Sequence, residues 1–290
     1  MKNLLSAVLI FFVAGTAFTE ARIDITSAID WNTMQIKADV SLDLASAGIR
    51  LPSGRTQAEF LLSAGYSDLI RSSILNIQAD SSSTIGELIE RGEITLSDAG
   101  VIAANAAIVP PAYSSDLQRM FSSYTITLSG ISSVLSVNTR AVPVPRTLTP
   151  VSTAQYTGII IIAANELPVY GHKTEALPVP CLFPKIWDSG MNLIYERRML
   201  EARNKAMVHY FPLKSIFQNN PSALSPELRD IVGDKPLRIF AKGVFGINPS
   251  DLIIDSDDAM LIISSDENRR LLSQGKVAFI LSDSVLHLSY

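Results

Sequence analysis

The sequence contains few of the residue types on which catalysis, metal binding and covalent cross-linking depend. Among its 290 residues there are one cysteine, Cys181, and three histidines. A lone cysteine cannot close a disulfide within the chain, so the fold must be stabilised by its apolar core, which a chain of this length can supply. In an exported protein an odd thiol can also pair between molecules.

Charged residues are sparse as well. They make up 18% of the chain, the formal net charge is −4, and the 24 lysines and arginines are scattered. The sequence therefore offers no basic face for nucleic acid or for an anionic lipid surface. A hydrophobic content of 47% is typical of packed globular structure rather than of disorder.

The first residues predict export. A short basic segment, residues 1–3, leads into an apolar run at residues 4–18. This run has the length of a signal peptide and is short for a bilayer span, which needs about 20 residues. We predict a signal peptide at residues 1–21, cleaved after Ala17 or Ala21, and a periplasmic or otherwise exported protein with no stable membrane span. An uncleaved anchor is the alternative, and the absence of a nearby cysteine excludes a lipid anchor at this site.

Residues 22–135 have the pattern of an N-terminal α+β domain. Apolar and polar residues alternate in three segments, which is the period of a β-strand. Helical periods and capping patterns lie between them. The expected elements are strands at 23–25, 36–44 and 124–128, a long helix opened by a capping box at Thr56–Glu59, a helix at 85–92, and a helix at 99–108 capped by Ser97 and Asp98.

A change in composition and hydrophobic pattern marks the boundary between two predicted domains. Residues 136–155 contain Pro143, Pro145 and Pro150 without a helical period, which indicates an extended, proline-rich linker. Residues 156–290 then alternate strands and helices, as a C-terminal α/β domain does. The predicted fold class is α/β to α+β, with two small domains that each contain a few-stranded sheet packed by helices.

The C-terminal domain begins with an all-apolar run at 157–164, which predicts a strand buried on both faces. The further expected elements are a strand–turn–strand at 185–195, a helix from Ser225 to Gly233, strands at 236–246 and 251–255, helices at 256–263 and 264–275, and a strand at 276–281.

Cys181 is the strongest candidate for chemistry, but its neighbours do not favour that role. A nucleophilic cysteine needs a lowered pKa, which a histidine, a nearby cation or a helix N-terminus provides. The neighbours at 178–184 are prolines and apolar residues, and a hairpin follows. We interpret Cys181 as a packing residue at the start of that hairpin. The alternative is a hydrolase that uses Cys181 with His209.

Other patterns of known chemistry are incomplete. The three histidines, His172, His209 and His287, are far apart and lack companions at metal-ligand spacing. The acidic run at 255–258 lacks the third ligand and the glycine of a calcium loop, and helix capping explains it. Glycine patterns for phosphate and a hydrolase elbow are also incomplete. We predict no catalytic, cofactor-binding or metal-binding residue and no enzyme activity.

A series of short motifs in the second half of the chain resembles the motifs of a known protein family. The motifs are T-G before a hydrophobic strand at 157–162, L-x-P at 177–182, P-K-I-x-D-x-G at 184–195, P-L before a strand ending in A-x-G-V at 236–244, and D-L-I-I at 251–259. Together they resemble a family of exported bacterial envelope proteins related to the flagellar T-ring protein FlgT and to LPP-type lipoproteins. The resemblance covers about residues 157–281 and is weaker before that. Relatives carry an acidic residue and an arginine where this chain has Ile162 and Ala164, and the chain has no lipobox cysteine.

The resemblance implies a non-enzymatic envelope component, associated with a flagellum or another surface apparatus. With the export signal, it predicts a structural or assembly protein that acts through contacts with envelope proteins or with copies of itself. Trp187 and the loop at 168–173 are the candidate contact residues. The alternatives are the hydrolase that uses Cys181 and His209, and a small-molecule binding module with its pocket at the domain junction.

Overall fold

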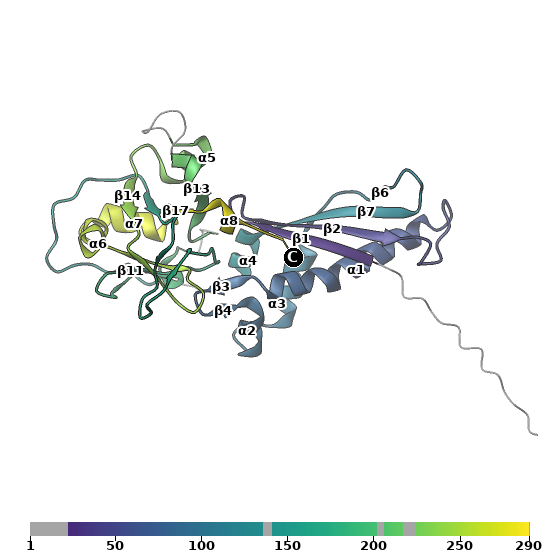
Figure 1. Ribbon diagram of the computed structural model, residues 1–290, viewed down its shortest axis with the longest axis horizontal. Coiled ribbons are helices and arrows are strands. Elements are labelled where there is room, and N and C mark those ends of the chain that lie inside the picture. The colour runs from purple at the N-terminus through teal and green to yellow at the C-terminus, as the bar shows by residue number, and fades with distance from the viewer. Residues whose placement is uncertain (1–22, 136–140, 202–205, 217–223, 290) are drawn as a thin grey trace, which may run out of the picture.

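The protein consists of two halves that lie end to end along its longest axis (Figure 1). The computed structural model describes residues 23–135, 141–201, 206–216 and 224–289, so the predicted signal peptide at 1–21 lies outside the described residues. Each half combines helices with small sheets. The predicted fold class, α/β to α+β in two domains, is confirmed.

An antiparallel sheet forms the body of the N-terminal half. Its strands are β1 (Ile23–Asp30), β2 (Gln35–Asp43), β5 (Ala107–Ile108), β6 (Ala112–Tyr113), β7 (Arg119–Thr127) and β18 (His287–Ser289). Their order is β18-β1-β2-β7-β5, and β6 also pairs with β7. Alternate residues of the long strands point to one face, where α1 (Arg55–Leu75) packs on β1 and β2. The Ser27 and Ser73 hydroxyls, on sheet and helix, are hydrogen-bonded at 2.8 Å.

The long helix α1 is present as predicted, but it begins one residue earlier than its proposed capping box. Thr56 lies inside the helix rather than before it, so it cannot cap the first turn. Glu59, expected to complete the box, instead pairs with Arg55 at 2.8 Å across one turn. The predicted cap is therefore wrong.

The helix α3 (Leu96–Ala104) also has a different cap from the predicted one. The Thr95 hydroxyl accepts a hydrogen bond from the Asp98 N–H, and the Asp98 carboxylate accepts one from the Thr95 N–H. Ser97 lies within the helix, and the chain leaves the helix after Ala104 and enters β5, which the prediction had placed in the helix.

A β-hairpin and two shorter helices complete the N-terminal half. The hairpin consists of β3 (Gln78–Asp80) and β4 (Ser83–Thr84), and the helices are α2 (Ile85–Glu90) and α4 (Leu128–Leu135). Thr84 and Glu87 form a capping box at the start of α2. Leu128, expected at the end of a strand, is the first residue of α4.

A parallel sheet is the centre of the C-terminal half. Its strands, in the order β13-β17-β8-β14, are β13 (His209–Pro212), β17 (Val277–Leu281), β8 (Ile159–Ile162) and β14 (Leu237–Phe240). The predicted all-apolar strand is β8, an inner strand with Ile160 in one hydrophobic cluster and Ile161 in another. It is buried on both faces, as predicted. The helix α5 (Pro226–Val232) and the 3-10 helix η2 (Leu213–Ile216) contribute apolar side chains to the cluster that contains Ile160.

A second, mixed sheet lies beside the parallel one. It has the order β12-β11-β16-β15, with strands β11 (Ile186–Asp188), β12 (Leu193–Tyr195), β15 (Gly243–Phe245) and β16 (Asp251–Ile254). The predicted hairpin is β11–β12. The remaining elements are the hairpin β9 (Leu167–Pro168) and β10 (Glu175–Ala176), the 3-10 helix η1 (Arg197–Met199), and the helices α6 (Ser256–Ile263), α7 (Asp266–Ser273) and α8 (Asp283–Leu286).

The two halves share one hydrophobic core and are also joined through the backbone. The Leu182 N–H donates to the Gln78 carbonyl at 3.0 Å, and the Phe183 N–H donates to the Ala79 carbonyl at 2.8 Å, so the edge of β3 docks on the second half. The last strand, β18, pairs with β1 in the N-terminal sheet. Residues 287–289, predicted in the C-terminal domain, therefore complete the sheet of the N-terminal half.

The linker has no helix or strand in its described part, residues 141–155, and it lies against the second half. The Val142 N–H donates to the Arg198 carbonyl at 2.7 Å, and Val144 is buried. Within the described residues, no helix combines the length and the apolar character needed to cross a bilayer.

Candidate functional site

Cys181 is held in the interior as a packing residue. It is 0% exposed. Its backbone N–H donates to the Tyr210 hydroxyl at 3.1 Å, and the same hydroxyl donates to its carbonyl at 2.7 Å. Burial raises the pKa of the thiol far above its ordinary value, which disfavours the reactive thiolate. The prediction of a packing residue ahead of the hairpin is confirmed.

His209 lies on the other side of the parallel sheet from Cys181. Successive residues of a strand point to opposite faces. Tyr210 faces Cys181, so His209 shares its face with Phe211, which belongs to the cluster under α5. Burial lowers the pKa of His209. The sheet therefore separates the sulfur from the imidazole, and the structure does not bring together the two groups that the hydrolase alternative requires.

The remaining histidines and the acidic run at 255–258 do not come together in one site. His172 is exposed in the loop of the β9–β10 hairpin. The His287 Nδ1 lies 3.4 Å from the Asp30 Oδ1, between β18 and β1. Asp255 caps α6, accepting a hydrogen bond from the Asp257 N–H at 3.1 Å, as predicted for the acidic run. Among the residues that the structure describes, no three metal-ligating side chains are grouped so that they could hold a metal ion.

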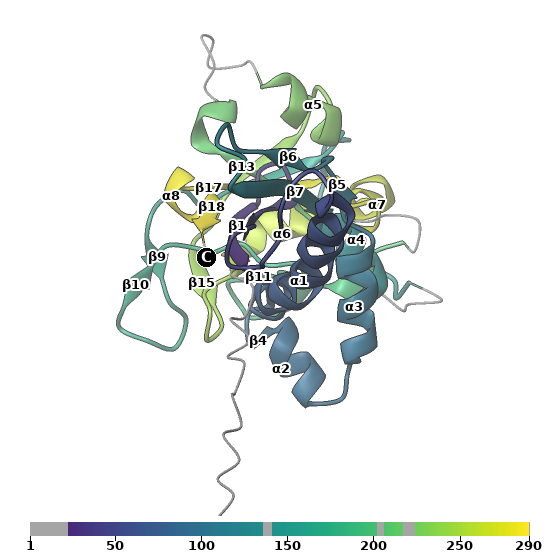
Figure 2. The same cartoon turned by 90° about the vertical axis from the view of Figure 1, so that its right-hand side faces the viewer.

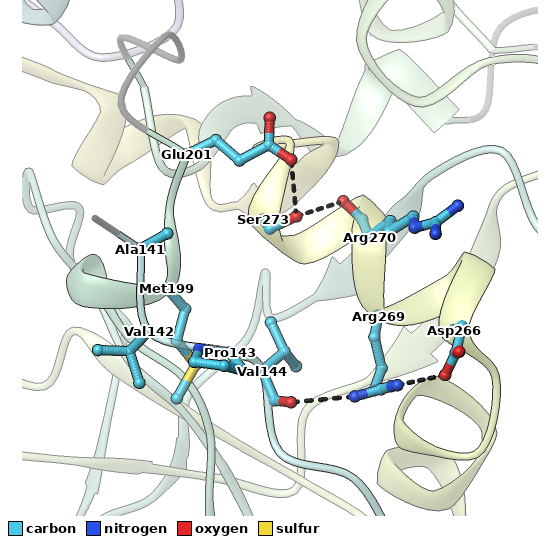
Figure 3. A pocket seen from close by; sticks show the side chains of 10 residues that line it. All are labelled: Ala141, Val142, Pro143, Val144, Met199, Glu201, Asp266, Arg269, Arg270 and Ser273. Atoms are coloured by element: carbon cyan, nitrogen blue, oxygen red, sulfur yellow. Dashed lines mark hydrogen bonds and ion pairs between the residues drawn. The ribbon is translucent and has the colours of Figure 1, made fainter. Parts of the chain in front are cut away.

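A cavity of about 330 Å³ lies where the linker meets α7 (Figure 3). Arg269 donates to the Val144 carbonyl at 3.2 Å and pairs with Asp266. Ser273 donates to Glu201 at 3.3 Å. These charged and polar groups are bound to one another and to the linker. We therefore interpret the residues of the cavity wall as structural: through Arg269 and Val144 they hold the linker against the second half.

The motifs behind the family resemblance have structural explanations. The Thr157 hydroxyl donates to the Val232 carbonyl at 2.7 Å, and a Cβ on Gly158 would lie 2.4 Å from the Val232 Cα, so the T-G pair lets β8 approach the end of α5. Asp188 accepts from the backbone and side chain of Asn192 in the β11–β12 turn.

Asp251, from the D-L-I-I motif, is a fully buried carboxylate at the junction of the halves. It accepts hydrogen bonds from the Lys185 N–H at 2.9 Å and from the Trp187 Nε1 at 3.2 Å. Its third donor is the Ser81 hydroxyl, at 3.0 Å, which belongs to the turn between β3 and β4 in the other half. Burial raises its pKa, and the hydrogen bonds oppose that shift. The carboxylate therefore ties the first half to the second sheet.

One face of the second sheet carries a row of aromatic side chains. Ile186, Leu252 and Ile254 belong to the main core, so Trp187 and Phe245 lie on the opposite face, beside the buried residues Asp251 and Ile253. Their ring centroids are 5.9 Å apart, and Tyr170 continues the row at 6.1 Å from Phe245.

Apolar side chains at the edge of this face are open to solvent, while Trp187 and Phe245 are half-buried. Tyr170 is 50% exposed, and Ile247, in the turn that follows β15, is 85% exposed. The Lys185 ammonium lies 6.0 Å from the Trp187 ring centroid, within the range of a cation–π contact. We call Tyr170, Trp187, Phe245 and Ile247 the aromatic face. Figure 2 shows the β9–β10 hairpin beside β15, projecting from the body of the molecule.

The structure brings together residues that the sequence analysis had singled out separately. Trp187 and the loop at 168–173, the two candidate contact regions, meet through Phe245. Phe245 and Ile247 were not predicted. Their place beside Trp187 depends on the pairing of β11 and β15 with β16, which sequence periodicity does not give.

Two family models cover the two halves of the chain. Residues 22–134 match the model of the N-terminal domain of Treponema pallidum Tp0624, and residues 158–283 match the model of its second domain. Both halves match Tp0624 domain families. The Tp0624 matches leave out residues 135–157, which contain the predicted linker. No curated protein matches the chain. The relation to FlgT and to LPP-type lipoproteins stays a prediction.

Proposed function

We propose that this protein is a non-enzymatic, exported structural or assembly protein that acts through protein–protein contacts made by the aromatic face. The observation that carries the proposal is the row of Trp187, Phe245 and Tyr170, which runs from the buried Asp251 out to a tyrosine ring that is 50% exposed. Aromatic residues, with their large and rigid contact area, are enriched at protein interfaces.

The described polar groups support a contact role rather than catalysis. Asp188, Asp251 and Asp255 each accept hydrogen bonds that fix a turn, the junction or a helix start. The thiol of Cys181 and the imidazole of His209 lie on opposite sides of a sheet. Export rests on the sequence of residues 1–21.

The proposal is tested by the size of the native particle after mild extraction and cross-linking. We expect Ile247→Glu, combined with Tyr170→Ser, to convert a complex into the free chain, because a charge and a lost ring remove the apolar contact. The matched control is Phe60→Glu, since Phe60 is 69% exposed on α1, far from this face in sequence. A wild-type chain that stays monomeric and unlinked under these conditions would overturn the proposal.

A further inference from the structure

A cavity opens on the face of the N-terminal sheet that lies opposite α1. It measures about 300 Å³, which is at the lower end of the range of about 300–1,000 Å³ for small-ligand pockets. Its outward-pointing side chains come from β1, β2 and β7 and consist of two carboxylates, three hydroxyls and one phenyl ring. They are Asp24, Thr26, Asp39, Ser41, Phe121 and Ser123.

The register of the strands arranges these six side chains in two adjacent rows. The first row is Asp24, Ser41 and Phe121, and the second row is Thr26, Asp39 and Ser123. Directly paired side chains have Cβ atoms about 4.5–5.5 Å apart, and the rows are two residues, or about 7 Å, apart along the strands. One small molecule in the cavity can therefore contact both rows.

The groups in these rows are open to solvent. The Ser27 hydroxyl bonds to α1, so Asp24 and Thr26 in the same strand point to the opposite face. Both are exposed, as is Asp39, and Phe121 is 40% exposed. A molecule that enters the cavity therefore reaches the carboxylates and the phenyl ring without any change in the fold.

Phe121 provides a flat apolar surface among polar groups. A pyranose ring with equatorial substituents has the same division, because its two faces carry C–H groups and its rim carries hydroxyls. Stacking such a face on the phenyl ring removes apolar surface of both partners from water. The rim of the sugar then lies level with the neighbouring polar side chains of the sheet.

The polar side chains match the hydroxyls of such a rim. A carboxylate only accepts hydrogen bonds, and a bond that it accepts is roughly twice as strong as one between neutral groups. The Ser123 hydroxyl donates to the Asp39 Oδ1 at 2.5 Å, which orients that carboxylate. The hydroxyls of Thr26 and Ser41 are able both to donate and to accept.

The charge of the wall selects a neutral sugar. Asp24 and Asp39 both line the cavity, and the described residues of its lining include no lysine or arginine. A sugar that carries a carboxylate or a phosphate would meet two like charges at short range.

We propose that this cavity binds a neutral pyranose, with Phe121 stacked on one face of the ring and with Asp24 and Asp39 accepting hydrogen bonds from its hydroxyls. The aromatic face lies on the other half of the chain, so this site goes beyond the protein-contact function. Its test does not depend on a protein partner.

The first test compares methyl β-D-glucopyranoside with methyl β-D-glucuronide, which has the same ring and a carboxylate in place of the CH₂OH group. Amide signals of the ¹⁵N-labelled protein are recorded during each titration. We expect the glucoside to shift the signals of Thr26, Ser41 and Ser123 with a dissociation constant of about 1–10 mM. We expect the glucuronide to bind at least about tenfold more weakly, because of the two carboxylates in the wall.

Two variants separate the stacking contact from the charged one. Phe121→Ala should weaken binding of the glucoside at least about fivefold, and the matched control Phe60→Ala, at a 69% exposed position on α1, should leave it unchanged. Asp39→Asn keeps a hydrogen-bonding group and removes one charge. It should weaken binding of the glucoside and narrow the difference between the two probes.

A third probe, n-butylammonium, tests the competing class of ligand, because carboxylates and a phenyl ring also attract a cation. Tighter binding of n-butylammonium than of the glucoside would assign the cavity to cations and overturn the proposal. Equal binding of the glucoside and the glucuronide, or no saturable shift with the glucoside, would also overturn it. These three titrations use the wild-type protein, so they decide the matter even if a variant does not fold.

Discussion

At the scale of single residues, the chemistry of this chain is set by burial. Cys181 and Asp251 are fully buried and His209 is largely buried, and burial disfavours the charged form of each side chain. The thiol and the carboxylate have raised pKa values, and the imidazole has a lowered one. Each group is neutralised or held by hydrogen bonds, and none is paired for proton transfer.

We predict that the Cys181 thiol is unreactive until the protein unfolds. In the native state at pH 8, a thiol reagent such as 5,5′-dithiobis(2-nitrobenzoic acid) should label it at least about a hundredfold more slowly than in urea, because the sulfur is buried and its pKa is raised. Labelling of the native protein at the rate of a free thiol would contradict the structure.

We predict that His209 makes the protein less stable in acid. Its folded pKa lies below its ordinary value of 6.5, so its contribution to stability is present above about pH 6.5 and is lost as the pH falls through the folded pKa. The free energy of unfolding, measured with urea between pH 7 and pH 5, should fall more in the wild type than in His209→Gln. Parallel curves for the two proteins would refute this role.

At the scale of elements, close approach between β8 and α5 fixes the parallel sheet. Gly158 lies where an added Cβ would be 2.4 Å from the Val232 Cα, which is backbone and cannot move aside. We predict that Gly158→Ala lowers the free energy of unfolding by about 1–3 kcal/mol or more.

The matched control for this change is Gly100→Ala in α3, where nothing lies within 4 Å of the added Cβ. Alanine there should stabilise the helix by up to about 1 kcal/mol. Urea unfolding of the two variants measures both effects, and equal stabilities would show that the close approach does not exist.

Most elements of the fold could be predicted from sequence, because period and capping are local signals. The alternation in residues 36–44 and the apolar run at 157–164 correspond to β2 and β8. The helix caps at Thr56 and Ser97 were misplaced by one or two residues. The first helix already begins at Arg55, and Thr95 with Asp98 caps α3, because several residues near each start are able to form a cap. Neither the pairing of β18 with β1 nor the aromatic face could be predicted, because both depend on long-range pairing.

At the scale of the whole molecule, the Ser81–Asp251 hydrogen bond connects the two halves. We predict that Ser81→Ala lowers the free energy of unfolding by about 1–3 kcal/mol at pH 7, because the buried carboxylate loses a donor. The loss should shrink as the pH falls through the raised pKa of Asp251, since a protonated carboxyl needs fewer donors. Ser97→Ala, at an exposed position in α3, is the control. A pH-independent loss would show that Ser81 acts only through packing.

The central claim is that the aromatic face contacts a protein partner. The most direct measurement is site-specific photo-cross-linking in intact cells, with p-benzoylphenylalanine placed at Tyr170, at Ile247 or, as a control, at Phe60. All three positions are at least half exposed. We predict a discrete adduct from positions 170 and 247 and none from position 60. Adducts from position 60 alone, or from none of the three, would contradict it.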